Sequence, residues 1–121
     1  MTRLGVDYLN LYIIHRFDYS TPMAETMEAL DRLVRDGRAR ALGASAMYGY
    51  QLHNLQRVAD ENGWTRLSSL QNHYNLLYRE DERELIPVVR QYGMSLTPYS
   101  PLASGHLTRS TWDSDSVRST T

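Results

Sequence analysis

The feature that most constrains the fold is the alternation of two kinds of segment along the chain. Four short apolar runs, at residues 9–15, 39–45, 67–72 and 94–99, are separated by segments whose apolar residues recur every three or four positions. Runs of the first kind indicate buried strands, and segments of the second kind indicate helices. Strands that follow one another through helices run parallel in one sheet, so the sequence predicts an α/β fold with parallel strands alternating with helices.

The first helix has expected signals at both ends. Thr21 is predicted to cap its amino end, with Pro22 at the first helical position, where a missing N–H removes no helical hydrogen bond. Gly37 is predicted to end the helix, because the residue just past a helix often adopts the left-handed conformation that glycine tolerates. Between these ends the apolar residues recur at helical spacing: Met23, Met27, Leu30 and Val34.

The later helices and the end of the chain carry weaker signals. The second helix is expected to end near Gly63, and its apolar stripe consists of Leu52, Leu55, Val58 and Ala59. The third helix is expected at residues 84–90, with Pro87 in the first turn and the regular helix starting later than the apolar pattern. Residues 104–121 are rich in Ser, Thr and Asp, so we expect a loop or a disordered end there.

Periodicity leaves two parallel architectures open, an open doubly wound sheet and an arc of a barrel. Open sheets that bind nucleotides often carry a glycine-rich phosphate loop directly after a strand. Neither GxxxxGK[ST] nor GxGxxG occurs in this sequence. The usual nucleotide signatures of open sheets are therefore missing, although the pattern alone does not choose between the two architectures.

Charge and composition exclude several classes of function. The formal net charge is −1, with no long run of one sign, so no nucleic-acid partner is expected. The longest apolar runs are only a few residues, far short of the roughly 20 that cross a bilayer, so no membrane span is expected. The amino end lacks the apolar core of a signal peptide and cysteine is absent, which predicts a cytoplasmic protein.

No metal site is expected from the four histidines, since they lack the close paired spacing of metal ligands. His53 lies among polar neighbours in the second helix and is expected to be solvated. His73 and His106 are assigned no role.

Polar residues follow the apolar runs at the expected strand ends: His15, Ser45, Gln71 with Asn72, and Tyr99 with Ser100. The carboxyl ends of parallel strands meet at one edge of a sheet, where α/β proteins bind their ligands. The sequence therefore predicts a polar site along this edge.

Four segments resemble the aldo-keto reductase family, in that family's order and at its spacing: residues 4–18 (LGVDYLNLYIIHRFD), 37–45 (GRARALGAS), 71–79 (QNHYNLLYR) and 97–105 (TPYSPLASG). The resemblance extends over nearly the whole chain, from the fourth strand to the loop after the seventh strand of the family's barrel. It implies a partial (β/α)8 TIM barrel over residues 1–121 and the NADPH-dependent reduction of aldehydes or ketones to alcohols.

The resemblance assigns a catalytic role to His15. In this family a hydride passes from the nicotinamide to a carbonyl carbon, and a tyrosine protonates the oxygen. A lysine and an aspartate lower the pKa of that tyrosine, while the histidine orients the carbonyl through a hydrogen bond. A donor aimed at the carbonyl oxygen stabilises the charge that develops there. The alternative for His15 is a strand-end histidine whose hydrogen bonds are satisfied by a neighbour.

Two further residues resemble the pair that holds the nicotinamide carboxamide, Ser45 and Gln71. An amide needs both a donor and an acceptor, which Gln71 supplies and Ser45 supplements. Many family members have asparagine directly after this serine, whereas this chain has Ala46, which removes one hydrogen bond to the carboxamide. The alternative for Ser45 is that it caps the following helix.

The fourth strand end resembles the family's ring-stacking and phosphate-binding segment. Tyr99 resembles the aromatic residue that stacks on the nicotinamide ring, although a strand-end tyrosine can also pack on the core edge with its hydroxyl in water. Ser100, Leu102 and Ser104 match the loop that wraps the pyrophosphate with hydroxyl and backbone N–H groups.

Other parts of the family's machinery have no counterpart in the sequence. All thirteen basic residues are arginine, so the lysine that the resemblance implies is missing, and the aspartate, tyrosine and lysine are expected upstream of Met1. The chain is therefore expected to be a truncated part of the enzyme, and its open sheet edges predict self-association or a complementary chain. Two alternatives remain: a non-catalytic nicotinamide-nucleotide-binding or scaffold module, and a functionless remnant. The identity of the carbonyl substrate stays open.

Overall fold

The computed structural model describes residues 3–109 and contains one parallel four-stranded sheet. The strands lie side by side in chain order: β1 (Tyr12–Ile14), β2 (Leu42–Ser45), β3 (Leu67–Gln71) and β4 (Ser95–Leu96). They alternate with three helices: α1 (Met23–Arg35), α2 (Gly49–Asn62) and α3 (Leu85–Gln91). The predicted parallel α/β fold is confirmed, and each strand is shorter than the apolar run that predicted it.

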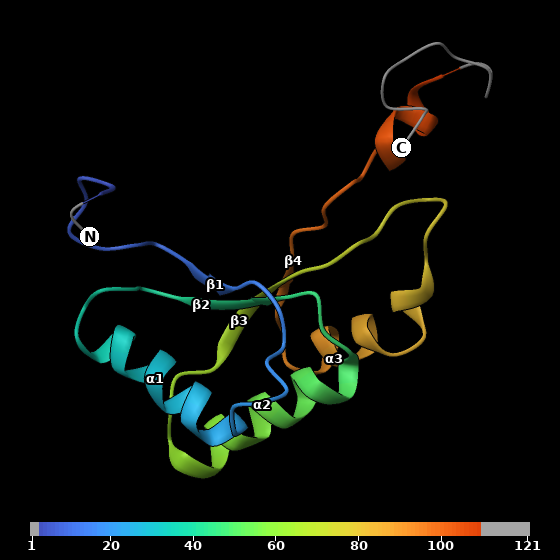
Figure 1. Cartoon of the computed structure of the whole chain (residues 1–121). Helices are drawn as coiled ribbons and strands as arrows, with labels where there is room; N and C mark the ends of the chain where they lie inside the picture. The colour runs from blue at the N-terminus through green and yellow to red at the C-terminus, as the bar shows by residue number, and fades with distance from the viewer. Residues whose placement is uncertain (1–2, 110–121) are drawn as a thin grey trace.

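The helices decide between the two architectures that the sequence left open. Figure 1 shows α1, α2 and α3 on the same side of the sheet, and within residues 3–109 no α-helix lies on the other side. A doubly wound sheet has helices on both faces, whereas a barrel has all its helices outside the strands. The described part of the chain is therefore consistent with an arc of a TIM barrel.

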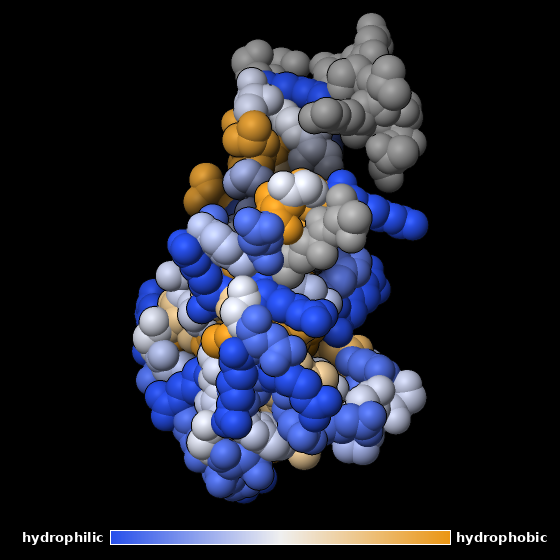
Figure 2. Space-filling model, turned by 90° about the vertical axis from the view of Figure 1, so that its left-hand side faces the viewer, coloured by the Kyte–Doolittle hydropathy of each residue, from blue (hydrophilic) through white to orange (hydrophobic). Residues whose placement is uncertain are grey.

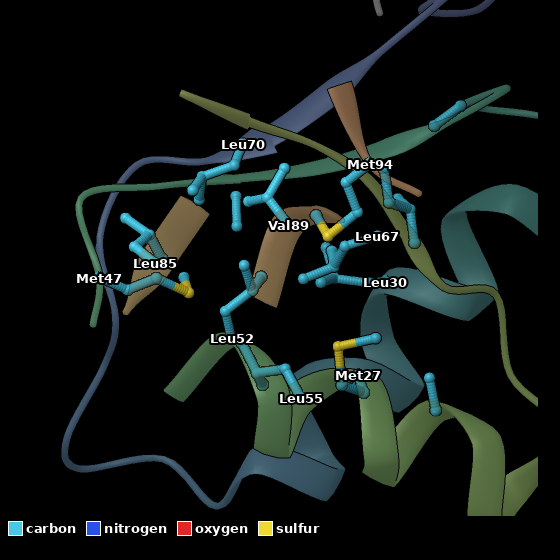
Figure 3. Packing of buried hydrophobic residues seen from close by; sticks show 14 residues of the cluster. Met27, Leu30, Met47, Leu52, Leu55, Leu67, Leu70, Leu85, Val89 and Met94 are labelled. Carbon is cyan, nitrogen blue, oxygen red and sulfur yellow. The ribbon is translucent and has the colours of Figure 1, made fainter. Parts of the chain in front are cut away.

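The hydrophobic core lies between the sheet and the helices. Figure 3 shows Leu67 and Leu70 of β3 on the sheet side of the cluster, with Leu52 of α2 and Met27 of α1 on the helix side. All four side chains are completely or almost completely buried. On the face seen in Figure 2, the lower part formed by the helices is mostly hydrophilic, and hydrophobic side chains gather in the upper part.

The strands present different side chains to the two faces of the sheet. Leu42 and Ala44 of β2 belong to the core on the helix side. Because successive strand residues point to opposite faces, Gly43 and Ser45 face away from the helices. The register aligns Ile13, Gly43, Ser69 and Ser95 in one row across the sheet. This row consists mostly of small residues.

Two predicted helix ends are confirmed and one predicted cap is wrong. Gly37 follows the end of α1 with φ 68°, and Gly63 closes α2 with φ 66°, the left-handed conformation that glycine tolerates. At the start of α1, Pro22 itself occupies the cap position, and no side-chain cap bond forms. The Thr21 hydroxyl donates to the Asp18 carboxylate at 2.6 Å, so the Thr21 side chain belongs to the preceding turn, and α1 begins one residue later than predicted.

The third helix begins earlier than predicted. α3 starts at Leu85, and Pro87 is its third residue, so the proline lies in the first turn as expected. A proline there removes no helical hydrogen bond, because the first N–H groups of a helix have no partner within it. The expected delay of the regular helix is therefore wrong.

The stretch expected to be a loop from Ser104 onward is described only in part. Residues Ala103–Thr108 form a 3-10 segment with non-helical backbone at Ser104 and Gly105. Residues 110–121 lie outside the described part of the chain. Within residues 3–109, no helix is long and apolar enough to cross a membrane.

Candidate functional site

Three of the residues selected from the sequence lie level with one another at the carboxyl ends of adjacent strands. Ser45 of β2 pairs with Gln71 of β3. His15 follows Ile14, whose strand partner is Ala44, so His15 stands level with Ser45. By strand alternation the three residues lie on the face away from the helices. We refer to His15, Ser45 and Gln71 as the polar row.

The members of the polar row differ in exposure. Ser45 is only 4% exposed, Gln71 is half-buried and His15 is exposed. A small buried hydroxyl is thus flanked by a longer amide and an imidazole that solvent can reach. This arrangement offers a donor and an acceptor from Gln71 and a ring nitrogen from His15 on one surface.

A cavity of about 320 Å³ opens at the same edge of the sheet. Its walls come from the segments that follow all four strands, including Phe17 after β1, Met47 after β2, His73 after β3 and Tyr99 after β4. Of the predicted site residues only Tyr99 lines this cavity. The structure therefore places Tyr99 on a wall that is distinct from the polar row.

Ala46 departs from ordinary backbone geometry where it lines this cavity. Its φ is 47°, in the left-handed region that favours glycine or asparagine over alanine. Its N–H donates to the Gln71 carbonyl at 3.2 Å, which joins the ends of β2 and β3. The conformation that suits asparagine is present at this position, and the carboxamide side chain is not.

The loop after β4 curls around a second cavity of about 450 Å³. Ser100, Leu102 and Ser104, all selected from the sequence, line it. Ser100 and Ser104 both have φ 56°. Successive left-handed turns of this kind gather backbone N–H groups in a concavity that suits an anion. Three such groups already donate within the loop: the Ala103 N–H to the Ser100 carbonyl, and the Gly105 and Leu107 N–H groups to the Leu102 carbonyl.

Three aromatic rings stack at the edge of the first cavity. The His73 ring lies nearly parallel to Tyr78, with centroids 4.4 Å apart and 19° between the planes. It is also nearly parallel to Tyr99, at 5.1 Å and 8°. No pattern in the sequence assigns His73 a role, because Tyr99 is distant in the chain and Tyr78 is separated from it by a turn.

Asn75 ties the loop after β3 to the loop after β4. Its Oδ1 accepts hydrogen bonds from the N–H groups of Leu77 and Tyr78, both at 2.9 Å. Its Nδ2 donates to the Ser100 carbonyl at 3.0 Å. Asn75 is buried, so these bonds are sheltered from water. Asparagine favours turns of this type, which is the one signal in the sequence that could have indicated the connection.

Charged side chains hold the rest of the β3 loop in place. The Glu82 carboxylate accepts hydrogen bonds from the Arg79 guanidinium at 2.8 and 2.9 Å and from the Tyr74 hydroxyl. The bonds from Arg79 and then Tyr74 lower the pKa of Glu82, and the bond to Glu82 raises the pKa of Tyr74. Asn72 donates to Asp81 at 2.8 Å. The loop that carries His73 is thereby fixed at both ends.

The other histidines have separate surroundings. His53 is half-buried, and its Nδ1 lies 2.9 Å from the Tyr92 hydroxyl, so the expectation of a solvated side chain is wrong. The α2 and α3 helices pack together there. Within residues 3–109, no group of three His, Cys, Asp or Glu side chains is placed to hold a metal ion.

Sequence similarity agrees with this geometry. The model of the Aldo/keto reductase family matches residues 1–121 of the chain. The chain therefore belongs to the aldo/keto reductase family, as the four motifs indicated.

Individual relatives are similar over most of the chain. An aldo-keto reductase of Fusarium vanettenii is 51% identical over 109 residues, which are 90% of this chain and 30% of the relative. The aldo-keto reductase AMT2 of Alternaria alternata is 49% identical, with the same coverage of both chains. The versiconal hemiacetal acetate reductase of Aspergillus parasiticus is 47% identical over 88% of this chain and 31% of its own length. The chain thus spans about 30% of the length of the curated relatives it matches.

Proposed function

We propose that this chain forms the nicotinamide-binding and carbonyl-orienting part of an aldo/keto reductase active site, which reduces aldehydes or ketones to alcohols with NADPH. The observation that carries the proposal is the polar row: His15, Ser45 and Gln71 stand level at the carboxyl ends of three neighbouring strands. This edge is where barrel enzymes place their active sites. The ligand partner is a small carbonyl compound, and neither nucleic acid nor a membrane is part of the proposal.

The side chains of the row fit the groups they would hold. The Gln71 amide can donate to and accept from a carboxamide, and the Ser45 hydroxyl can supplement either bond. When bound, the nicotinamide supplies the hydride. The His15 imidazole can donate a hydrogen bond to the carbonyl oxygen of a substrate and stabilise negative charge that develops on it. Solvent reaches His15, so a substrate can reach it as well.

The geometry of the loop after β4 supports the proposal that this loop binds the pyrophosphate of the nucleotide. Ser100, Leu102 and Ser104 line one cavity and lie in a segment with repeated left-handed residues. Such a curl suits the oxygens of a pyrophosphate. Tyr99, directly before this loop, is 42% exposed, and its ring suits stacking on the nicotinamide.

We propose that the proton donor and the residues that tune its pKa lie outside this chain. The sequence has no lysine, and its relatives are about three times as long as the matched region. We propose that this chain acts as a truncated share of the enzyme, with the missing lysine supplied by a complementary chain, and that the open sheet edges favour pairing with that chain or with another copy. We propose a cytoplasmic location, in keeping with the absence of cysteine.

A second candidate is a non-catalytic module that binds nicotinamide nucleotide or acts as a scaffold. It is favoured by one observation, namely that the cofactor residues are present in a sequence without lysine. This candidate predicts NADPH binding without turnover when the complementary segments of a relative are added.

The test is a titration of the purified chain with NADPH, followed by the change in nucleotide fluorescence. We expect saturable binding that Gln71→Ala weakens by about tenfold, the effect of losing roughly one good hydrogen bond to a buried amide. Gln91→Ala at the exposed end of α3 is the matched control and should leave binding unchanged. A folded chain that does not bind NADPH would overturn the proposal, and equal binding of NADH would remove its preference for the phosphorylated cofactor.

A further inference from the structure

The stack formed by Tyr78, His73 and Tyr99 combines rings from two different loops. His73 and Tyr78 belong to the loop after β3, and Tyr99 follows β4. The near-parallel arrangement of His73 and Tyr99 covers one face of the Tyr99 ring. Tyr99 nevertheless remains 42% exposed and lines the cavity at the carboxyl edge. Solvent therefore reaches the part of the ring that His73 does not cover.

The backbone around the stack fixes where the rings can lie. His73 and Tyr99 form an isolated parallel bridge, and the Tyr99 N–H donates to the Asn72 carbonyl at 2.8 Å. Asn75 Nδ2 lies 3.4 Å from His73 Nε2 and also donates to the carbonyl of Ser100, the residue after Tyr99. The ring contact thus rests on a main-chain bridge and on one buried asparagine.

Tyr78 holds His73 from the side of its own loop. Its N–H is bound by Asn75 Oδ1, so the turn that carries Tyr78 is closed by the same asparagine that contacts His73. Ring stacking at 4.4 Å then restricts rotation of the His73 side chain. A histidine that cannot rotate presents a flat, fixed surface to Tyr99.

We propose that His73 is a positioning residue: it holds the Tyr99 ring in one orientation, so that the open part of that ring is already aligned for the nicotinamide. The inference rests on the proposed function of the site. His73 itself does not contact the cofactor in this proposal and acts only through Tyr99. Prior orientation lowers the cost of ordering the tyrosine when the ligand binds.

The test compares three variants of the full chain in NADPH titrations and in near-ultraviolet circular dichroism. His73→Ala should weaken NADPH binding by about threefold to tenfold, the range expected for losing one aromatic pair. It should also reduce the tyrosine dichroism of the free chain, because an ordered ring stack produces that signal. His73→Phe keeps a flat ring at this position and should therefore retain both the NADPH affinity and the ordered tyrosine dichroism of the wild type. His53→Ala is the control: it removes a histidine–tyrosine contact between α2 and α3 and should leave NADPH binding unchanged.

A double variant separates positioning from general support of the fold. If His73 acts through Tyr99, adding His73→Ala to Tyr99→Ala causes no further loss of NADPH binding. Additive losses would overturn the inference, as would unchanged binding and dichroism in His73→Ala. If the wild-type chain binds NADPH and His73→Ala binds equally well, the inference alone fails and the proposed function stands. If the wild-type chain does not bind at all, both fail.

Discussion

The two faces of the sheet differ in what their side chains do. On the face toward the helices, Leu42, Ala44 and Leu70 are completely buried in the core. On the other face, Gly43 and Ser69 sit in a row of mostly small residues, and the polar row follows at the strand ends. The first face supplies the buried apolar area that stabilises the fold, and the second supplies the candidate chemistry.

Residues that stabilise the core and residues of the candidate site alternate along the same strands. Ala44 and Ser45 are neighbours in β2, as are Leu70 and Gln71 in β3, and each pair divides between the faces. A substitution at one residue should therefore affect folding, while a substitution at the next should affect binding. The following experiments examine that separation, in order of decreasing expected effect.

Leu70→Ala should have the largest effect, because it empties a fully buried position on the helix-facing side of a central strand. Loss of a buried leucine costs about 2–5 kcal/mol of the free energy of unfolding, which urea denaturation can measure. Leu76→Ala makes the same change at a side chain that is 76% exposed, and it should stay within about 0.5 kcal/mol of the wild type. Equal losses in the two variants would show that β3 does not pack as described.

Gly43→Ala should have an intermediate effect on the opposite face. An added methyl group would lie 2.5 Å from Ser69 Oγ and 3.1 Å from Ile13 Cγ1, so neighbouring atoms would have to move. Overpacking of this kind costs about 1–3 kcal/mol. The Ser69 hydroxyl is buried without a hydrogen-bond partner, so Ser69→Ala should by itself cost little. The double variant should recover part of the stability, and failure to recover any would mean that Ser69 is not the obstacle.

The smallest effect is expected in the turn that carries the chain from the carboxyl edge of β1 to α1. The Asp18 carboxylate accepts hydrogen bonds from the Ser20 hydroxyl and N–H and from the Thr21 hydroxyl, at 2.6–2.8 Å. These bonds, led by that from the Ser20 hydroxyl and then that from the Thr21 hydroxyl, lower the pKa of Asp18 from 3.8 to about 2. The charged form is therefore favoured in the folded chain, so its contribution is present above pH 3.8 and is lost as the pH falls through about 2.

Carbon-13 NMR titration of the Asp18 carboxyl measures this shift directly. Asp18→Asn should flatten the acid dependence of unfolding in the same interval. Removing the donors instead, with Ser20→Ala and Thr21→Val together, should return the pKa of Asp18 toward 3.8. A carboxyl that titrates near 3.8 in the wild type would contradict the geometry of this turn.

The alternation of strands and helices was predictable because it depends on local patterns. Apolar spacing located all three helices, and Gly37 and Gly63 marked two of their ends correctly. The start of α1 was not predictable from its own residues, because the Thr21 side chain is held by Asp18 in the preceding turn and Pro22 occupies the cap position. Such a competition becomes visible only when the turn is folded.

For the candidate site, the residues at the strand ends could be predicted from the sequence, and the contacts between loops could not. Strand ends pointed to His15, Ser45 and Gln71, and the register brings these three residues level. The position of His73 could not be predicted, because its stacking on Tyr99 depends on β3 and β4 lying side by side. Contacts between residues distant in the chain leave no local pattern to recognise.

The register shift between β2 and β3 has a consequence for changes in chain length. Leu67 pairs with Leu42 and Ser69 with Gly43, so Ser68 is the one residue left without a place in the pairing. Leu67 and Ser69 pair with consecutive residues of β2, so they occupy the alternating positions that two adjacent residues have in a regular strand. An in-frame deletion of Ser68 would therefore leave every other side chain of β3 on its present face. Deletion of Ser69 would give the same Leu-Ser-Leu-Gln sequence, whereas deletion of Leu70 would remove a buried core side chain. A related gene could therefore lose either serine codon of this strand with the same result.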